Sequence, residues 1–309
     1  MVAVSGVAWP AAAGAATVSV EPFRWDTSFG ACGHYMSCPA DMVVLTAASG
    51  EINRVAITET VVGFEQTRFL VRDYNEGSLV AGAGCERVAE SPIAAALVCT
   101  AEALGPQQIG DGDDRISSPR GLVSGGDGDD AIMVNSGVAH GGRGDDVLLA
   151  PRATGSEGDD VLIGTLGVGG SGDDLVMGSG RGGPGDDTMR CLPQDVSCSL
   201  FGGPGHDVLT GGTHRDRLFG EGGHDLVEGG VRHDELDGGP GNDRLVGGRG
   251  RDTLEGRAGS DTLEAREDRS AGEEPKNDRV DCGKGRRDKA TVDHRDAVRR
   301  CERVARDRE

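Results

Sequence analysis

Aromatic side chains are scarce in this sequence. Its 309 residues include 2 tryptophans, 2 tyrosines and 6 phenylalanines, or 3% in total, and many of the 36% hydrophobic residues are alanine. This composition excludes a single large core built on aromatic residues. The 53 glycines and the net charge of −20 instead favour a chain that buries small apolar residues in short, repeated contacts, as a solenoid does.

Long hydrophobic runs are also missing. No segment reaches the ~20 apolar residues that a transmembrane helix needs. The N-terminal run MVAVSGVAWPAAAGAATVSVEP contains Pro10 and two glycines, and it places Ala13 and Ala15 in A-x-A spacing. We interpret residues 1–16 as a secretory signal peptide that is cleaved after Ala15 or Ala16 and has a truncated start, because a basic segment is lacking. The alternative is a disordered, alanine-rich end.

Catalytic motifs are not found either. The sequence contains no HExxH, no G-x-S-x-G, and no dinucleotide or P-loop fingerprint between a strand and a helix. His34, inside CGHYMSC, is a lone histidine without the partners of a triad. We therefore predict that the protein is not an enzyme. The alternative is a secreted enzyme with an unrecognised catalytic site in residues 17–106.

The eight cysteines contain no CxxC pair, which makes zinc binding a weak alternative. They fall into close neighbours along an exported chain, so local disulfides are the simplest prediction. The predicted pairs are Cys32 with Cys38, Cys85 with Cys99, Cys191 with Cys198, and Cys282 with Cys301.

Three regions follow the signal peptide. Residues 17–106 contain short runs such as TVSV, MVVLTA, NRVAIT and FLVRD, which predict a small β domain. Glycine and aspartate blocks then fill residues 107–264, irregularly in 107–190 and in strict tandem in 202–264, with CLPQDVSC forming a disulfide-closed insertion at 191–201. Residues 265–309 are rich in charge and begin with a worn repeat around Asp278 and Val280.

The strict array has a period of nine residues, which a flexible glycine-rich linker would not show. The sixth place of each block is Asp207, Asp216, Asp225, Asp234, Asp243, Asp252 and Asp261. The eighth place is always leucine or valine: Leu209, Leu218, Val227, Leu236, Leu245, Leu254 and Leu263. Paired glycines allow a tight curl, and the last three residues form a minimal strand with its middle side chain inward. One block is then half a coil, and stacked coils bury the apolar column.

Blocks two apart should stack, so the aspartates form two columns. Asp207, Asp225, Asp243 and Asp261 line one edge of the coil, and Asp216, Asp234 and Asp252 line the other. Carboxylates one strand spacing apart repel each other. Calcium removes this repulsion, because it favours a shell of carboxylate and carbonyl oxygens, whereas magnesium retains its waters. The sequence therefore predicts several bound Ca²⁺ ions.

Upstream the blocks recur at intervals of 13 to 16 residues. This spacing predicts one ion-binding curl per coil with a plain return segment, and hence a single column. Its metal ligands are Asp114, Asp130, Asp146, Asp160, Asp174 and Asp187.

These blocks match G-G-x-G-x-D-x-U-x, and the chain resembles RTX, or haemolysin-type, calcium-binding repeat proteins, whose repeats form a parallel β-roll. GGPGNDRLV at 238–246 and GGPGHDVLT at 202–210 match in full, whereas His214 and Arg232 replace the fourth-place glycine. A side chain at positive φ costs on the order of 1 kcal/mol, so we expect weaker calcium binding at the Asp216 edge. The N-terminal region is similar to secreted calcium-binding proteins of actinobacteria, in which it resembles a starting cap.

The expected fold is thus all-β: a parallel β-roll with a small N-terminal β cap and a short C-terminal capping helix. The helix is predicted from Ala297, Val298, Cys301, Val304 and Ala305, which share one helical face. Its arginine-rich outer face is interleaved with acids, which favours a solvated cap over an anionic partner, and we expect no nucleic-acid partner. The fifth-place histidines His206, His224 and His233 are expected to be exposed turn residues, with zinc or copper binding as the alternative.

We expect a calcium-stabilised extracellular protein with a structural or binding role, possessing an unidentified extracellular or cell-surface partner. Without calcium the aspartate columns repel, and the roll has too little apolar surface to order itself. Affinities of ~0.1 to 1 mM, as in extracellular calcium modules, would order it only outside the cell. A membrane-active toxin is a poorer alternative, because apolar or amphipathic helices ahead of the repeats are missing.

Overall fold

The computed structural model describes residues 17–22, 41–46, 54–61, 67–73, 80–81, 85–91, 94–101, 103–108, 110–266 and 276–306. All regular elements in these ranges are β-strands, and no helix there could cross a membrane. The chain divides into two compact units, Met1–Pro151 and Arg152–Glu309. The predicted signal peptide lies outside the described residues.

The first unit joins antiparallel strands to the first parallel coils. Its strands are β1 (Thr17–Pro22), β2 (Asp41–Thr46), β3 (Arg54–Val61), β4 (Thr67–Asp73), β5 (Val80–Ala81), β6 (Cys85–Ser91), β7 (Ala94–Ala101), β8 (Ala103–Gln108), β9 (Arg115–Ser118), β10 (Gly121–Asp127), β11 (Ala131–Val134), β12 (Gly137–Arg143) and β13 (Val147–Leu149). β1 pairs with β2, β3 with β4, and β7 with β4 and β6, all antiparallel. These pairings agree with a small N-terminal β region.

The coils of the first unit have two parallel walls. β8, β10 and β12 form one wall, and β9, β11 and β13 form the other. β2 pairs in parallel with β8, and β3 pairs in parallel with β9. Each wall therefore continues, at its N-terminal edge, into a strand that also belongs to an antiparallel pair. That the N-terminal region acts as a cap remains a prediction.

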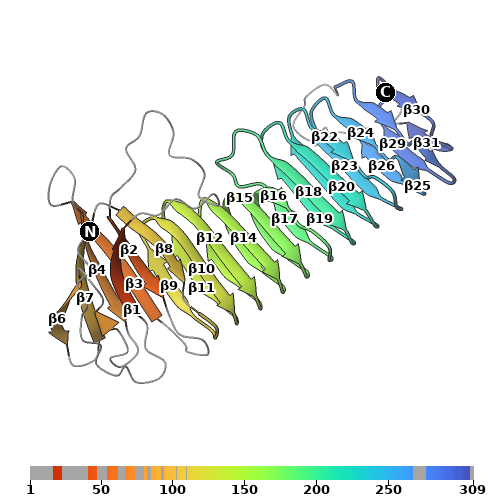
Figure 1. The fold of residues 1–309 in the computed structure, drawn as a ribbon. Helices are drawn as coiled ribbons and strands as arrows, with labels where there is room; N and C mark the ends of the chain where they lie inside the picture. The colour runs from red at the N-terminus through yellow and green to blue at the C-terminus, as the bar shows by residue number, and fades with distance from the viewer. Residues whose placement is uncertain are drawn as a thin grey trace. The chain divides into compact units, whose positions relative to one another are not determined.

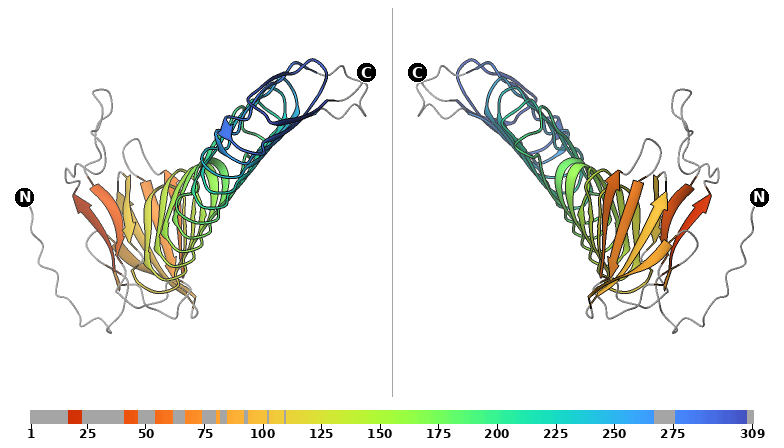
Figure 2. Two further views of the ribbon diagram at one scale, coloured as in Figure 1. Left: turned by 90° about the vertical axis from the view of Figure 1, so that its right-hand side faces the viewer. Right: turned by 90° about the vertical axis from the view of Figure 1, so that its left-hand side faces the viewer.

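The second unit is a parallel solenoid (Figures 1 and 2). Its strands are β14 (Arg152–Glu157), β15 (Val161–Ser171), β16 (Leu175–Arg181), β17 (Thr188–Arg190), β18 (Ser199–Pro204), β19 (Val208–Gly212), β20 (Arg217–Gly222), β21 (Leu226–Val231), β22 (Glu235–Asp237), β23 (Arg244–Arg249), β24 (Thr253–Glu255), β25 (Ala258–Gly259), β26 (Thr262–Ala265), β27 (Arg279–Asp281), β28 (Lys284–Gly285), β29 (Lys289–Val292), β30 (Ala297–Arg299) and β31 (Arg303–Arg306).

The predicted 18-residue coil is confirmed by the register. Leu209 lies opposite Val227, and Val227 opposite Leu245, along one wall. On the other wall Leu218 lies opposite Leu236. All of these eighth-place side chains are fully buried, because they point inward while the residues on either side of them point outward. The two facing columns make the thin apolar core that the composition required.

The predicted C-terminal helix is wrong for the described residues 297–306. Ala297–Arg299 and Arg303–Arg306 are strands β30 and β31, which pair in parallel with β27 and β29. The apolar spacing that suggested one helical face arises from two successive strands, each with a middle residue, Val298 or Val304, in the register of the core columns. The solenoid therefore continues beyond residue 264, where the recognisable blocks end.

Two of the predicted disulfides are confirmed, Cys191–Cys198 and Cys282–Cys301. The first closes the insertion between the two arrays, and the second joins successive coils near the C-terminus. Cys85 lies opposite Cys99 in the register of β6 and β7, although their side chains are outside the described part. Cys32 and Cys38 lie outside the described residues altogether.

Candidate calcium sites in the aspartate columns

The sixth-place aspartates stack as predicted. In the second unit, Oδ1 of each aspartate accepts a hydrogen bond from the backbone N–H of the aspartate one coil earlier, at 2.8–3.0 Å. This first column comprises Asp160, Asp174, Asp187, Asp207, Asp225, Asp243 and Asp261. In the first unit, Asp114, Asp130 and Asp146 stack in the same way. The stacking of the upstream aspartates is thus confirmed within each unit, and their role as calcium ligands stays a prediction.

A second column starts only after the disulfide. Asp216, Asp234 and Asp252 are linked by the same hydrogen bonds, at 2.8–2.9 Å. Oδ1 of Asp216 accepts its bond from the backbone N–H of Cys198, at 2.9 Å. The disulfide-closed loop thus occupies the place of the preceding aspartate and terminates this column.

Both columns extend further than the glycine blocks. The first continues to Asp288, and the second continues through Asp278 to Asp296. The backbone N–H of Asp288 donates to Oε2 of Glu302 at 2.8 Å. Asp288 and Asp296 were not predicted as site residues. The signal they leave in the sequence is an aspartate two residues before an apolar one, DKA and DAV. Only Gly283 and Gly285 precede Asp288 in its segment, and the segment before Asp296 has no glycine.

The carboxylates are buried, with at most 3% of each sixth-place residue exposed. While Oδ1 is hydrogen-bonded, Oδ2 has no hydrogen-bond partner in the described part of the chain at Asp130, Asp174, Asp187, Asp207, Asp216, Asp225, Asp234, Asp243, Asp261 and Asp288. A buried charged oxygen without a partner is costly, and a cation is the usual compensation. Rows of such oxygens therefore fit a bound metal ion.

Burial raises the pKa of many of these carboxyl groups, because desolvation disfavours the charged form. The backbone hydrogen bond to Oδ1 lowers each pKa in part, and adjacent aspartates raise most of them further. The resulting pKa is about 7 for Asp130, Asp174, Asp187, Asp207, Asp234 and Asp243, and about 6 for Asp261. Without a cation these columns resist full ionisation at neutral pH.

The first-place glycines bring carbonyl oxygens to the same spots. A β-carbon at Gly220 would lie 2.3 Å from Oδ2 of Asp225 and 2.6 Å from the carbonyl oxygen of Gly238, one coil later. At Gly202 the corresponding atoms are Oδ2 of Asp207 and the carbonyl oxygen of Gly220, at 2.1 and 2.7 Å. Only glycine leaves room for this approach. A free carboxylate oxygen beside a carbonyl of the next coil supplies the hard oxygen ligands that calcium prefers.

The fifth-place residues form a second ladder that the sequence did not suggest. Its side chains point the other way, accepting a bond from the backbone N–H one coil later. The acceptors are Oδ1 of Asp113, Asp129, Asp159, Asp173 and Asp186, Nδ1 of His206, His224 and His233, and Oδ1 of Asn242. The sixth-place side chain of a block thus accepts a hydrogen bond from the coil before it, and the fifth-place side chain accepts one from the coil after it.

The rings of His206 and His224 stack, with centroids 4.9 Å apart and nearly parallel planes. Both Nδ1 atoms accept backbone bonds, so only Nε2 is left to bind a metal, and Nε2 of His224 already contacts the side-chain amide of Asn242 at 3.4 Å. Zinc or copper binding remains an untested alternative.

Backbone strain does not separate the two edges in the way predicted. Arg232 does have positive φ, at 86°, but His214 is not among the positive-φ residues. On the opposite edge Glu221 and Arg257 have φ of 70° and 71° at the second place of their blocks. Both edges therefore carry strained side chains, and the expectation of weaker binding at the Asp216 edge has to rest on charge instead.

Comparison with protein families agrees with this geometry. Residues 152–167, 199–227 and 228–263 match the RTX calcium-binding nonapeptide repeat in 4 copies. No curated protein matches the chain. The repeat matches and the parallel β-solenoid together support an RTX-type calcium-binding repeat protein.

Proposed function

We propose that this is a secreted protein whose β-roll folds on meeting extracellular calcium and then serves a structural or binding role. The observation that carries the proposal is the row of buried Oδ2 atoms without hydrogen-bond partners in the described part of the chain. Several of them, as at Asp207 and Asp225, lie where a backbone carbonyl of the next coil also approaches. Calcium would neutralise the columns and add its binding free energy to folding. Secretion is consistent with disulfides, which persist in oxidising compartments.

The proposal assigns no catalytic role. The carboxylates of the columns are held in repeated, equivalent environments, and each is committed to a backbone bond through Oδ1. An array of this kind is suited to bind several ions and to stiffen the chain. The extracellular partner would then recognise the ordered outer walls.

Calorimetric titration of the full chain with calcium tests the binding, with magnesium as the competing ion. The variant Asp225→Asn plus Asp243→Asn keeps both Oδ1 acceptors but removes two charges from the first column. We expect it to bind fewer calcium ions per chain than the wild type. The matched control is Glu228→Gln plus Glu235→Gln, which removes two exposed carboxylates from the outer walls. Equal calcium binding by both variants, or equal binding of magnesium, would contradict the proposal.

A further inference from the structure

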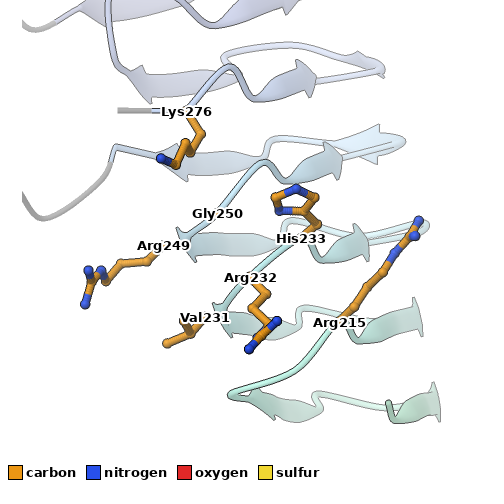
Figure 3. A pocket seen from close by; sticks show the side chains of 7 residues that line it. All are labelled: Arg215, Val231, Arg232, His233, Arg249, Gly250 and Lys276. Carbon is orange, nitrogen blue, oxygen red and sulfur yellow. The ribbon is translucent and has the colours of Figure 1, made fainter. Parts of the chain in front are cut away.

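The edge that carries the second column also carries a basic pocket with a volume of about 570 Å³. Arg215, Arg232, His233, Arg249 and Lys276 line it (Figure 3). They come from four successive coils, which places their side chains along one edge. We propose that this basic pocket binds a small organic ligand through a phosphate or sulfate group.

Three cations of the pocket, Arg215, Arg232 and Lys276, differ from other arginines of the second unit. Elsewhere arginines pair with carboxylates on the walls: Arg244 with Glu264 at 2.8 Å, and Arg217 with Glu235 at 3.4 Å. In the described part of the chain, Arg215, Arg232 and Lys276 form no ion pair. Arg215 does interact electrostatically with the buried carboxyl of Asp234. In a chain of net charge −20, three cations without an ion pair around one cavity still form a local cluster of positive charge.

The cluster of positive charge arises from the variable places of the repeat. Arg215 and His233 occupy the fifth place, Arg232 the fourth and Arg249 the third, and the 18-residue register stacks these places. On the opposite edge the equivalent fifth places hold His206, His224, Asn242 and Ser260. The two edges thus share the aspartates but differ in the charge that surrounds them.

Guanidinium groups are suited to tetrahedral oxyanions, because their forked N–H donors match two oxygens at once. Cavities of about 300 to 1,000 Å³ are typical of small-molecule sites, so the volume accommodates more than the anion itself. Val231 adds an apolar surface to the lining and is 39% exposed. A phosphate or sulfate ester with a carbon body meets both features.

Calorimetry on the full chain, in calcium chloride at low ionic strength, tests the proposal with three probes: sodium sulfate, glucose 6-sulfate and glucose 6-phosphate. We expect one site per chain, weakened by added salt. Arg215→Gln plus Arg232→Gly should weaken it about tenfold, since each charged hydrogen bond is lost. Tighter binding of the sugar esters assigns the site to an ester. If sodium sulfate bound as tightly as the sugar esters, the pocket would be a site for a free anion only, and the proposed organic ligand would be rejected.

Two features of the design separate binding from folding. Arg232→Gly restores the glycine of the repeat at a positive φ, so thermal stability should stay level or rise while anion binding falls. The matched control Arg257→Gly removes a cation from a similar positive φ on the opposite edge and should leave anion binding unchanged. Undetectable binding of all three probes at millimolar concentration would overturn the proposal, as would an equal loss in the control.

Discussion

The coils before and after the Cys191–Cys198 disulfide use one block in two ways. Upstream, each coil has a single block whose fifth and sixth places are both aspartate, as in Asp173 and Asp174. Downstream, each coil has two blocks and one sixth-place aspartate at each edge, as in Asp234 and Asp243. Both designs therefore contribute two repeat carboxylates per coil, concentrated on one edge upstream and divided between two edges downstream.

The cores differ in parallel with the charge. Downstream, both walls bury large side chains such as Leu236 and Leu245. In the first unit the return wall buries Val123 and Ala139 instead, opposite Ile132. The return wall of the first unit therefore buries smaller side chains than either downstream wall. Coil length thus changes together with the size of the buried side chains and with the number of aspartate columns.

The largest expected effect is that of pH on the calcium-free chain, because it acts on both regions. A folded-state pKa of about 7, raised from 3.8 by burial, means that the fold favours the protonated carboxyl. Its stabilising contribution is complete below pH 3.8 and is lost as pH rises through about 7. In EDTA we therefore expect far-UV circular dichroism to show more β structure at pH 5 than at pH 8.

Calcium should reverse this dependence, because the ion binds the ionised form. Its affinity should fall as pH drops below about 7, where the aspartates of the columns take up protons. A calcium-free spectrum that does not change between pH 5 and pH 8 would show that the columns are not the groups that limit folding.

The cores give the next largest effect. Leu245→Ala should destabilise the calcium-bound protein by about 2–5 kcal/mol, since the side chain is fully buried between two others of its wall. Ala139→Gly, its upstream counterpart, removes one methyl group and should cost about 1 kcal/mol. Urea unfolding of both variants in excess calcium measures the difference. If the two variants lost similar free energies of unfolding, the proposed difference between the upstream and downstream cores would be wrong.

Arg232→Gly sharpens the comparison of the two downstream edges. Relief of the positive φ should stabilise the chain by about 1 kcal/mol, and loss of the cation should strengthen calcium binding at the second column. Hydrogen exchange during a calcium titration reads peptides around residues 213–256 directly. If these peptides became protected only at a higher calcium concentration in the variant than in the wild type, the electrostatic explanation of this edge would be refuted.

The smallest effect concerns the upstream doublets. Asp173→Asn plus Asp186→Asn retains the Oδ1 acceptors of the ladder but removes two exposed charges beside the first column. We expect residues 160–187 of the variant to become protected from hydrogen exchange at calcium concentrations a few-fold higher than in the wild type. The reason is that an exposed charge near an ion contributes less than about 1 kcal/mol to its binding. Protection at unchanged calcium concentration would show that the buried column alone sets affinity.

Much of the second unit could be predicted because its signals are local and periodic. The nine-residue interval from Asp207 to Asp261 specifies the coil length, the inward leucines and both columns without any long-range information. The single upstream column followed from the same reasoning. Cys191–Cys198 and Cys282–Cys301 followed from proximity along the chain.

The remainder depended on the register between coils, which no single block contains. Asp288 follows only Gly283 and Gly285 rather than a full block, and Asp296 follows a segment without glycine. Their place in the columns is therefore visible only through the strands that pair beside them. The helix predicted over Ala297–Ala305 failed for the same reason: two short strands separated by a turn imitate helical spacing. The basic pocket joins variable places from four coils, and a reading of one block at a time cannot reveal it.

The most direct test of the central claim is far-UV circular dichroism of the full chain during a calcium titration at neutral pH, with magnesium as the control ion. Our account predicts a cooperative gain of β structure with calcium alone, weakened by Asp225→Ala plus Asp243→Ala. A chain that already shows its full β signal in EDTA and does not respond to calcium would contradict it. The aspartate columns would then be a feature of a metal-independent scaffold.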